Sequence, residues 1–367
     1  MGSLTGGSGW KERYSRQIRF APIGVEGQRS LDFSSALIVG CGALGASLAQ
    51  HMARAGVGRI VIADRDYVEP SNLQRQVLFD EADAEQALPK AAAAAEKLQR
   101  INSAIRIDAH VSDVSRHNVE KFADGVQLIL DGTDNAATRL LLSDAAFRQG
   151  IPFLYGGVVG AQGMSAVLVP GETACLRCLI GGEASALEGD SCDSVGVLAA
   201  AVEWVASLQA IEAVKWLTGN REAVRGTWLS ADLWDYRVRE SRLPGGTPSC
   251  PHCGVAAEVE RRGIGGGKTY GSGPAMEPAA TVLCGRDSVQ VTLGVELDMP
   301  LLRESLQRRG CRLQANKYLV KAYLPQGERL VLFPDGRVLV QGTSDVAGAE
   351  DLCRHYVTEY SIGGMKR

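Results

Sequence analysis

The sequence lacks a strong excess of charge of either sign and any long uninterrupted apolar run. Its 39 Lys and Arg residues nearly balance 42 Asp and Glu residues, leaving a formal net charge of −3. This balance gives no support to nucleic acid or an anionic membrane surface as the main partner. No apolar run reaches the roughly 18 residues that a transmembrane helix needs, and no signal peptide is recognised. We therefore expect a cytoplasmic protein without membrane contact.

A disulfide framework is not expected either, although the chain contains nine cysteines. Such frameworks belong mainly to small secreted domains, whereas 367 residues suffice for two or three domains. Four cysteines form two CxxC pairs, Cys175 with Cys178 and Cys250 with Cys253. Two thiolates at this spacing can bind one ion, and four together are typical of a closed structural Zn²⁺ site without catalysis at the metal. The alternative is four unrelated thiols.

A glycine turn lies between a predicted buried strand at residues 37–39 and a predicted helix. The turn contains Gly40, Gly42, Ala43 and Gly45. Glycine permits a tight turn and lets backbone N–H groups approach a phosphate, where the helix N-terminus adds positive potential. The next strand ends at Asp64, whose carboxylate could accept hydrogen bonds from ribose hydroxyls. The pattern predicts a nucleotide site but leaves NAD and ATP open.

The same alternation of strand and helix continues along the chain. Further strands are predicted at residues 59–63, 105–111, 126–130 and 152–155, with helices at 87–101 and 136–149. This order is typical of a Rossmann-like α/β fold, a doubly wound, mostly parallel sheet. Residues 162–169 are expected to add an antiparallel extension, and residues 227–234 a further strand. The apolar helix at 195–217 contains polar residues, among them Gln209 and Glu212, which argue against a membrane-spanning helix. We therefore expect a helix of the core or of a subunit interface.

A Gly-rich linker at residues 263–278 is predicted to separate a domain at 10–262 from a small α+β domain at 279–362, whose role is unknown. Residues 265–269 superficially resemble a phosphate loop but lack its first glycine and a preceding strand, so a linker is favoured. In the small domain, strands are predicted at 281–292, 313–324 and 329–342, and helices at 301–309 and 345–360. Cys284 is expected to be a buried thiol in a strand.

Polar residues follow two of the predicted strands at the carboxyl edge of the sheet. They are Asp66, Ser71, Asn72, Arg75, Gln76 and Lys90 after the second strand, and Asp131, Asp134 and Asn135 after the fourth. Several cations suit a triphosphate better than a dinucleotide, and an aspartate at this edge could hold Mg²⁺. Singly, each would more often be a surface residue. As a set at one sheet edge they favour ATP.

In order along the chain, these motifs resemble the MoeB/ThiF family, the bacterial relatives of ubiquitin-activating enzymes, over about residues 10–255. They are residues 13–17 (RYSRQ), 40–45, 64–66, 71–76, 89–90, 131–135 and both CxxC pairs. The resemblance implies ATP- and Mg²⁺-dependent adenylation of the C-terminal Gly-Gly carboxylate of a ubiquitin-like sulfur-carrier protein by a homodimer. A persulfide donor would then supply sulfur for a thiocarboxylate, in thiamine, molybdopterin or related sulfur metabolism.

The resemblance also assigns roles to individual residues. Asp64 would bind the ribose, while Asn72, Arg75 and Lys90 would bind the phosphates and Asp134 the Mg²⁺ ion. Arg16 would reach the ATP site of the partner subunit, which replaces our interpretation of the basic N-terminal segment as a solvated helix face. Ala43 stands where the family often has another glycine and is small enough for the same turn.

Cys192 lies in an acidic loop before the long apolar helix. It matches a cysteine of the family's crossover loop that can bond covalently to the carrier or a persulfide, and the alternative is a dispensable loop thiol.

Alignment and charge neutralisation by Arg16, Arg75, Lys90 and Mg²⁺ would carry the adenylation, since the attacking carboxylate is already ionised and needs no general base. Rival hypotheses are activation of a ribosomal peptide or another carboxylate, an NAD-dependent oxidoreductase, and a non-enzymatic zinc scaffold.

Overall fold

The structure divides into two compact units, Met1–Gly265 and Gly266–Arg367, which are described separately. It is a computed structural model that describes residues 8–181, 195–254, 279–282 and 287–358. The predicted linker at 263–278, Cys192 and Cys284 lie outside the described residues. Among the described residues, no helix combines the length and apolar character required to cross a membrane.

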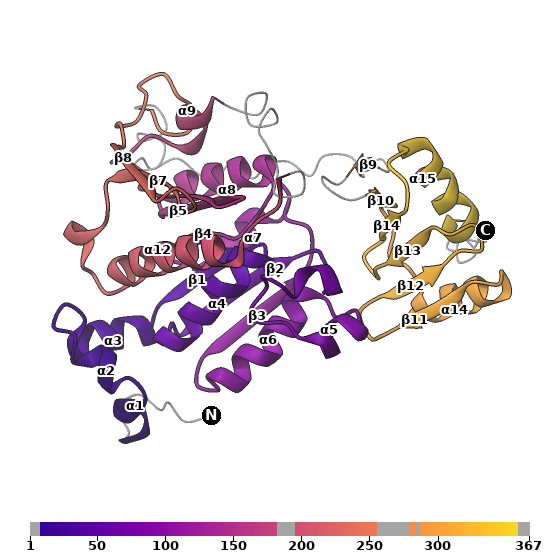
Figure 1. The fold of residues 1–367 in the computed structure, drawn as a ribbon, viewed down its shortest axis with the longest axis horizontal. Coiled ribbons are helices and arrows are strands. Elements are labelled where there is room, and N and C mark those ends of the chain that lie inside the picture. The colour runs from indigo at the N-terminus through magenta and orange to yellow at the C-terminus, as the bar shows by residue number, and fades with distance from the viewer. Residues whose placement is uncertain (1–7, 182–194, 255–278, 283–286, 359–367) are drawn as a thin grey trace. The chain divides into compact units, whose positions relative to one another are not determined.

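The first unit is built on a mixed sheet with the strand order β3-β2-β1-β4-β5-β6-β7-β8 (Figure 1). Its strands are β1 (Ser35–Val39), β2 (Arg59–Asp64), β3 (Arg106–Val111), β4 (Leu128–Asp131), β5 (Phe153–Val159), β6 (Gln162–Leu168), β7 (Thr227–Asp232) and β8 (Arg237–Arg242). Neighbours from β3 to β5 are parallel, and those from β5 to β8 are antiparallel. The predicted α/β class with an antiparallel extension is therefore confirmed.

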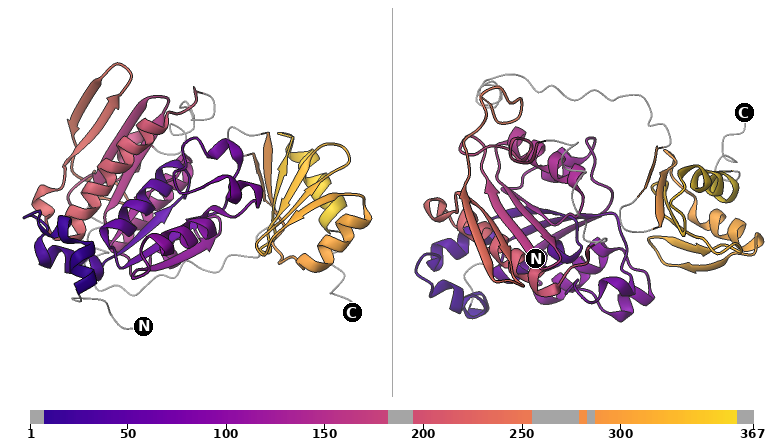
Figure 2. Two further views of the ribbon diagram at one scale, coloured as in Figure 1. Left: turned by 60° about the horizontal axis from the view of Figure 1, so that its bottom comes forward. Right: turned by 45° about the horizontal axis from the view of Figure 1, so that its top comes forward.

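Helices cover both faces of this sheet (Figure 2). They are α1 (Ser8–Arg13), α2 (Ser15–Ile18), α3 (Gly24–Asp32), α4 (Ala43–Ala55), η1 (Pro70–Asn72), α5 (Glu81–Glu85), α6 (Lys90–Ile101), α7 (Val119–Ala123), α8 (Ala136–Gln149), α9 (Leu176–Ile180), α12 (Ala199–Leu217) and η2 (Arg221–Ala223). Ala36 and Ile38 of β1 pack with α4, α6 and α12, whereas Leu37 and Val39 pack with α7, α8 and α9. The apolar run of β1 is buried throughout because side chains alternate between two covered faces.

Two elements of the first unit differ from the sequence prediction. Strand β8 was not predicted, because all six of its residues are exposed and its sequence, RVRESR, shows no alternation of apolar and polar residues. The long apolar helix begins at Ala199 and not at residue 195, since Val197 instead pairs with Gly160 in an isolated parallel bridge. Both differences lie at the antiparallel side of the sheet.

The second unit is an antiparallel six-stranded sheet with the order β11-β12-β13-β14-β10-β9. Its strands are β9 (Ala279–Val282), β10 (Ser288–Thr292), β11 (Arg312–Ala315), β12 (Val320–Tyr323), β13 (Arg329–Leu332) and β14 (Arg337–Gln341). Its helices are α14 (Met299–Arg308), α15 (Val346–Cys353) and the π-helical turn η3 (Arg354–Thr358). Apolar residues of the sheet, α14, α15 and η3 share one core.

Two strands predicted in the second unit are each divided, and a turn explains one of these divisions. Residues 281–292 and 313–324, each predicted as one strand, form two strands apiece. Between β11 and β12 the side chain of Asn316 accepts hydrogen bonds from the N–H groups of Tyr318 (2.8 Å) and Leu319 (3.0 Å), which stabilises a tight turn. The predicted hairpin at residues 334–336 is present between β13 and β14, with Gly336 at φ +85°.

Candidate nucleotide site and cysteine cluster

The glycine turn between β1 and α4 is held by close backbone packing. Gly40 has φ +79°, and a Cβ built on it would lie 2.7 Å from the carbonyl oxygen of Gly132. A Cβ on Gly45 would lie 1.7 Å from the carbonyl oxygen of Gly40. The N–H of Gly40 donates to Ala63 at 2.9 Å, and the N–H of Gly132 donates to Val39 at 2.9 Å. Glycine is therefore required at positions 40 and 45, because the backbone carbonyls of Gly132 and Gly40 occupy the places of the two Cβ atoms.

Gly42 is different, because no protein atom requires glycine there. It is the N-cap of α4, and a Cβ on it would meet only the Gln76 Nε2 atom, at 3.8 Å. Gln76 is 3 % exposed, and its Oε1 has no hydrogen-bond partner among the described residues. Free backbone N–H groups at the first turn of a helix, beside open space, are suited to a bound phosphate group.

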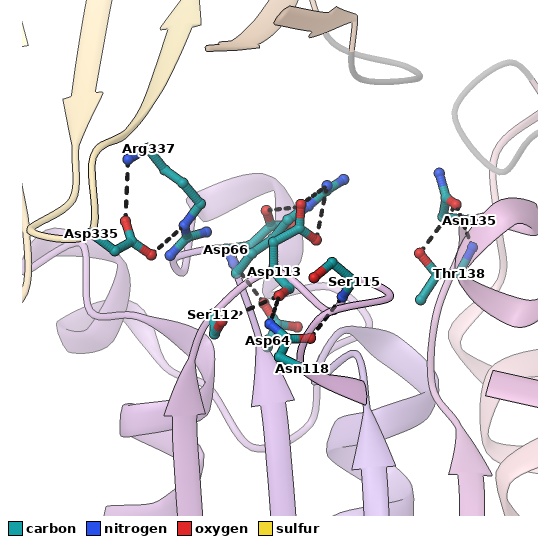
Figure 3. Close-up of polar contacts among 11 residues, drawn as sticks. Asp64, Asp66, Ser112, Asp113, Ser115, Asn118, Asn135, Thr138, Asp335 and Arg337 are labelled. Carbon is teal, nitrogen blue, oxygen red and sulfur yellow. Dashed lines mark hydrogen bonds and ion pairs between the residues drawn. The ribbon is translucent and has the colours of Figure 1, made fainter. Parts of the chain in front are cut away.

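Asp64 lies at the carboxyl end of β2 and joins the glycine turn to the following loop (Figure 3). Its carboxylate accepts hydrogen bonds from the N–H groups of Cys41 at 2.5 Å and Asp66 at 2.6 Å. Burial raises the pKa of Asp64, and the nearby ammonium of Lys90 opposes this change. Each carboxylate oxygen keeps a further lone pair, so the arrangement is compatible with hydrogen bonds from a ribose diol.

Lys90 is the first residue of α6, and its side chain is 4 % exposed. Its Nζ atom lies 3.0 Å from the Asp66 carboxylate, and its N–H donates to the Asp66 carbonyl at 2.9 Å. Asp66 thus holds Lys90 at the same sheet edge as Asp64. A lysine ammonium has three donors, so it can contact phosphate oxygens in addition to this carboxylate.

The loop after β2 carries three more of the predicted residues. Asn72 is buried, and its Oδ1 accepts from the Glu69 N–H at 3.1 Å, which caps the short helix η1. Arg75 is partly exposed and donates to the carbonyl of Ser71, an exposed residue, at 3.0 Å. In this structure Asn72 stabilises the loop, while the Arg75 guanidinium lies at the surface and keeps further donors for a ligand.

The polar residues after β4 have two distinct settings. Asp131 is fully buried, and its carboxylate accepts from Thr133 (N–H 3.0 Å, Oγ1 2.8 Å) and from Nε of Arg139 at 3.0 Å. Asp134 is exposed, and Asn135 caps α8 by accepting from the Thr138 N–H at 2.9 Å (Figure 3). Asp131 is thus engaged inside the protein, whereas Asp134 faces solvent at the same edge.

Three charged residues that we did not predict also belong to this edge. Arg139 also donates to the carbonyls of Thr133 (2.7 Å) and Gly156 (3.1 Å), and so fixes the turn after β4. Arg65 lies 3.2 Å from the Asp113 carboxylate, which follows β3. Burial disfavours the charged Arg65, but Asp113 and other carboxylates outweigh it and raise its pKa. The position of Asp113 just beyond a predicted strand was the signal that could have identified it.

Arg16 does not lie at this edge of its own subunit. It is exposed on α2, and its neighbour Gln17 donates to the carbonyl of Ala55 at 3.0 Å. Ala55 is the last residue of α4, whereas the glycine turn lies at the beginning of this helix. A helix of 13 residues is about 20 Å long, so Arg16 is attached at the far end of α4 from the nucleotide edge.

The four cysteines of the CxxC pairs come together on the face of the sheet covered by α8. The Sγ atoms of Cys175 and Cys250 are 3.8 Å apart, those of Cys178 and Cys253 are 3.7 Å apart, and all four lie within 4.8 Å of one another. A Zn–S bond of about 2.3 Å gives a tetrahedral S–S separation of about 3.8 Å, whereas a disulfide would require about 2.05 Å. The four sulfurs therefore fit a tetrahedral metal site.

Backbone groups favour thiolate character in one of these cysteines. Burial opposes ionisation of Cys250, but hydrogen bonds from the N–H groups of Cys253 and His252 and from the Cys178 and Cys253 thiols together lower its pKa to about 7. Burial raises the pKa of Cys175. Metal binding requires thiolates, so these backbone hydrogen bonds favour a metal site at the cluster.

The sheet, the glycine turn with Asp64, and the separate four-cysteine cluster define a nucleotide-binding α/β protein whose cysteine cluster is compatible with a metal site. The chain belongs to the ThiF family, whose model matches residues 14–252. The predicted family resemblance is thereby confirmed.

Relatives with curated names extend this assignment. The sulfur carrier protein ThiS adenylyltransferase of Bacillus subtilis is 40% identical over 352 residues, covering 94% of this chain and 99% of the relative. The SAMP-activating enzyme E1 of Haloferax volcanii is 36% identical over 66% of this chain and 88% of the relative. The adenylyltransferase and sulfurtransferase MOCS3-2 of Zea mays is 37% identical, but this chain spans only 50% of its length.

Solved structures share the fold of this chain. The Escherichia coli MccB structure with ATP has a TM-score of 0.58 at 20% identity, covering 69% of this chain and 77% of MccB. PaaA has a TM-score of 0.56 at 22% identity over 66% of this chain and 76% of that structure. At this identity the likeness concerns the fold alone.

Proposed function

We propose that this protein catalyses ATP-dependent adenylation of the C-terminal Gly-Gly carboxylate of a ubiquitin-like sulfur-carrier protein. The observation that carries the proposal is the 40% identity with a ThiS adenylyltransferase over 94% of this chain. That match includes both units and nearly all of the relative, so it is not limited to a shared nucleotide-binding core.

In the reaction, a carboxylate oxygen of the carrier attacks the α-phosphorus of ATP, and the bond from that phosphorus to pyrophosphate breaks. The backbone N–H groups at the start of α4 bind phosphate oxygens, and Asp64 accepts hydrogen bonds from the ribose. Arg75 and Lys90 neutralise the charge that develops on the phosphates. No general base is needed, because the attacking carboxylate is ionised at neutral pH.

Asp134 is the residue we assign to Mg²⁺. Its carboxylate is exposed at the nucleotide edge, whereas the Asp131 carboxylate is already bound by Thr133 and Arg139. Magnesium takes few protein carboxylates and keeps phosphate oxygens and water as its other ligands. The ion, when bound, supplies positive charge that stabilises the departing pyrophosphate.

We infer that the enzyme is a homodimer in which Arg16 of each subunit serves the other subunit's site. The attachment of α2 to the far end of α4 supports this inference, because an arginine side chain is much shorter than that helix. The zinc ion is assigned to the four cysteines, whose spacing leaves no position for a substrate.

A donor persulfide would attack the acyl-adenylate and release AMP, which leaves an acyl disulfide between the carrier and the donor. A second thiol would then attack the donor's sulfur in that disulfide, releasing the thiocarboxylate and leaving a disulfide between the thiol and the donor. Cys192 is our candidate for the covalent contact with the carrier or the persulfide. The pathway served is thiamine, molybdopterin or related sulfur metabolism, and the protein acts in the cytoplasm.

Exchange of labelled pyrophosphate into ATP tests the adenylation step. We expect exchange with a ubiquitin-like carrier that ends in Gly-Gly and none with the same carrier lacking those two residues. Absence of exchange with every such carrier, together with binding of NAD, would overturn the proposal. Exchange driven by a short ribosomal peptide in place of the carrier would favour peptide activation.

A further inference from the structure

The carboxylate of Asp144 contacts both CxxC loops. Asp144 lies in the middle of α8, a helix that contacts α9 (Figure 1). Arg177, the third residue of the first CxxC motif, donates from Nε to both carboxylate oxygens at 3.0 and 2.9 Å, and its Nη2 lies 2.8 Å from Oδ2. His252, the third residue of the second motif, has its Nδ1 at 3.3 Å from Oδ1. One side chain thus bridges equivalent positions of the two motifs.

Asp144 is a buried and paired carboxylate, unlike an ordinary charged residue of the surface. Asp144 is 5 % exposed, and a buried carboxylate is unfavourable unless it is paired. The partners named above come from the two cysteine loops. Its neighbour Ser143 is fully buried and accepts a hydrogen bond from the Leu176 N–H at 3.1 Å, at the first residue of α9. Helix α8 therefore holds the first loop at two consecutive residues.

The two loops are far apart in sequence, since Cys175 and Cys250 are separated by 75 residues. Bringing four sulfurs to one ion costs less free energy when the loops are already fixed relative to each other. We propose that Asp144 is a positioning residue for the metal site, which holds both loops through Arg177 and His252 so that the four thiolates retain zinc. This inference rests on the proposed zinc ion but does not depend on the adenylation reaction.

The direction in which Asp144→Asn changes the rate of zinc loss distinguishes a positioning role from a purely electrostatic one. Four thiolates around one Zn²⁺ carry a net charge of −2, so the negative charge of Asp144 is unfavourable near the site when it is considered alone. If only charge mattered, Asp144→Asn would reduce this repulsion and slow the loss of zinc. If Asp144 acts by fixing the loops, the same substitution weakens the bond to Arg177 and accelerates the loss.

The test measures zinc release from the full-length, zinc-loaded protein to the chelator 4-(2-pyridylazo)resorcinol. We expect Asp144→Asn and Arg177→Gln each to release zinc about 10- to 100-fold faster than the unchanged protein. The double variant should be no faster than the faster single variant, because both substitutions remove the same contact. Release from Asp144→Asn at the original rate or more slowly would overturn the proposal.

Two control variants distinguish loss of this contact from general destabilisation. Glu120→Gln removes an ion pair to Arg148, which also lies on α8, with an Nε–Oε1 distance of 2.9 Å and both side chains largely exposed. Ile60→Val makes a small cavity on the opposite face of the sheet. Both should release zinc at the original rate, and accelerated release from Ile60→Val equal to that from Asp144→Asn would contradict positioning. Less than one zinc per unchanged chain by elemental analysis would overturn the zinc assignment and this inference together, while pyrophosphate exchange would still test the adenylation proposal.

Discussion

Lys90 and Asp66 form an ion pair at the nucleotide edge, with the lysine Nζ 3.0 Å from the carboxylate and its side chain 4 % exposed. A lysine ammonium that is held in place costs no reorganisation when charge develops on nearby phosphates. The pair therefore links the loop after β2 to the proposed chemistry.

Replacing Lys90 by alanine is expected to lower kcat for pyrophosphate exchange by about 100- to 1,000-fold, the usual effect of removing one preorganised donor. Lys97→Ala is the matched control, since Lys97 lies on the same helix but pairs with Asp80 and Asp83. Unchanged exchange by Lys90→Ala would exclude Lys90 from the reaction.

Alanine at positions 42 and 45 should separate ligand binding from folding. At Gly45 the added Cβ would meet the Gly40 carbonyl at 1.7 Å, so we expect a loss of stability of about 3 kcal/mol in urea unfolding. At Gly42, where φ is −77° and the nearest atom is 3.8 Å away, stability should change by less than about 0.5 kcal/mol. Calorimetric ATP binding should nevertheless weaken in Gly42→Ala, because the Cβ enters the space assigned to phosphate. Unaltered ATP affinity in that variant would argue against the assignment.

The ion pair between Arg139 and Asp131 predicts a pH-dependent loss of stability. Burial raises the pKa of Asp131, and Arg139 opposes that rise. Without Arg139 the folded-state pKa lies still further above the unfolded value of about 3.9, so the stability penalty is relieved as pH falls through the folded-state pKa. Arg139→Gln should therefore lose about 3 kcal/mol near pH 7 and less near pH 5. Urea unfolding at both pH values measures this difference.

Arg148→Gln provides the control for this prediction. Arg148 lies on the same helix, but its pair with Glu120 is largely exposed, and such pairs contribute at most about 1 kcal/mol. A loss in Arg139→Gln that did not diminish on acidification would contradict the assigned role of Asp131.

Much of the first unit was predictable because its signals are local. The buried run before Gly40, the strand that ends at Asp64 and the two CxxC spacings each lie within a few residues. Contacts between distant charged residues were not predictable. Arg65 pairs with Asp113 across 48 residues, and Arg177 pairs with Asp144 across 33. In the sequence each of these four resembles an ordinary surface residue, and only the packing of parallel strands and α8 brings them together.

Gln209 shows the same limit within a predicted element. Sequence indicated a core or interface helix with a few polar members, and Gln209 is indeed buried on α12. Its amide donates to the carbonyls of Asp131 at 3.1 Å and Leu154 at 2.9 Å. Gln209 thereby satisfies the hydrogen-bonding capacity of one buried carbonyl in β4 and one in β5. The sequence does not reveal this role, because the short pairing of β4 with β5 leaves no local pattern.

Mixing two inactive variants tests whether Arg16 acts across a dimer interface. In a mixed dimer of Arg16→Ala and Lys90→Ala subunits, the site with intact Lys90 would receive intact Arg16 from the other subunit. One site in each mixed dimer would then work, while the second would carry both defects. Random exchange of subunits between equal amounts of the two variants makes half of the dimers mixed, so pyrophosphate exchange should recover to about a quarter of the activity of the unchanged protein.

If Arg16 served its own subunit, each site would lack one residue and mixing would restore nothing. Sedimentation measurements before and after mixing would verify that subunits associate and exchange, so that a failure to recover activity would count against the assignment of Arg16 to the partner's site.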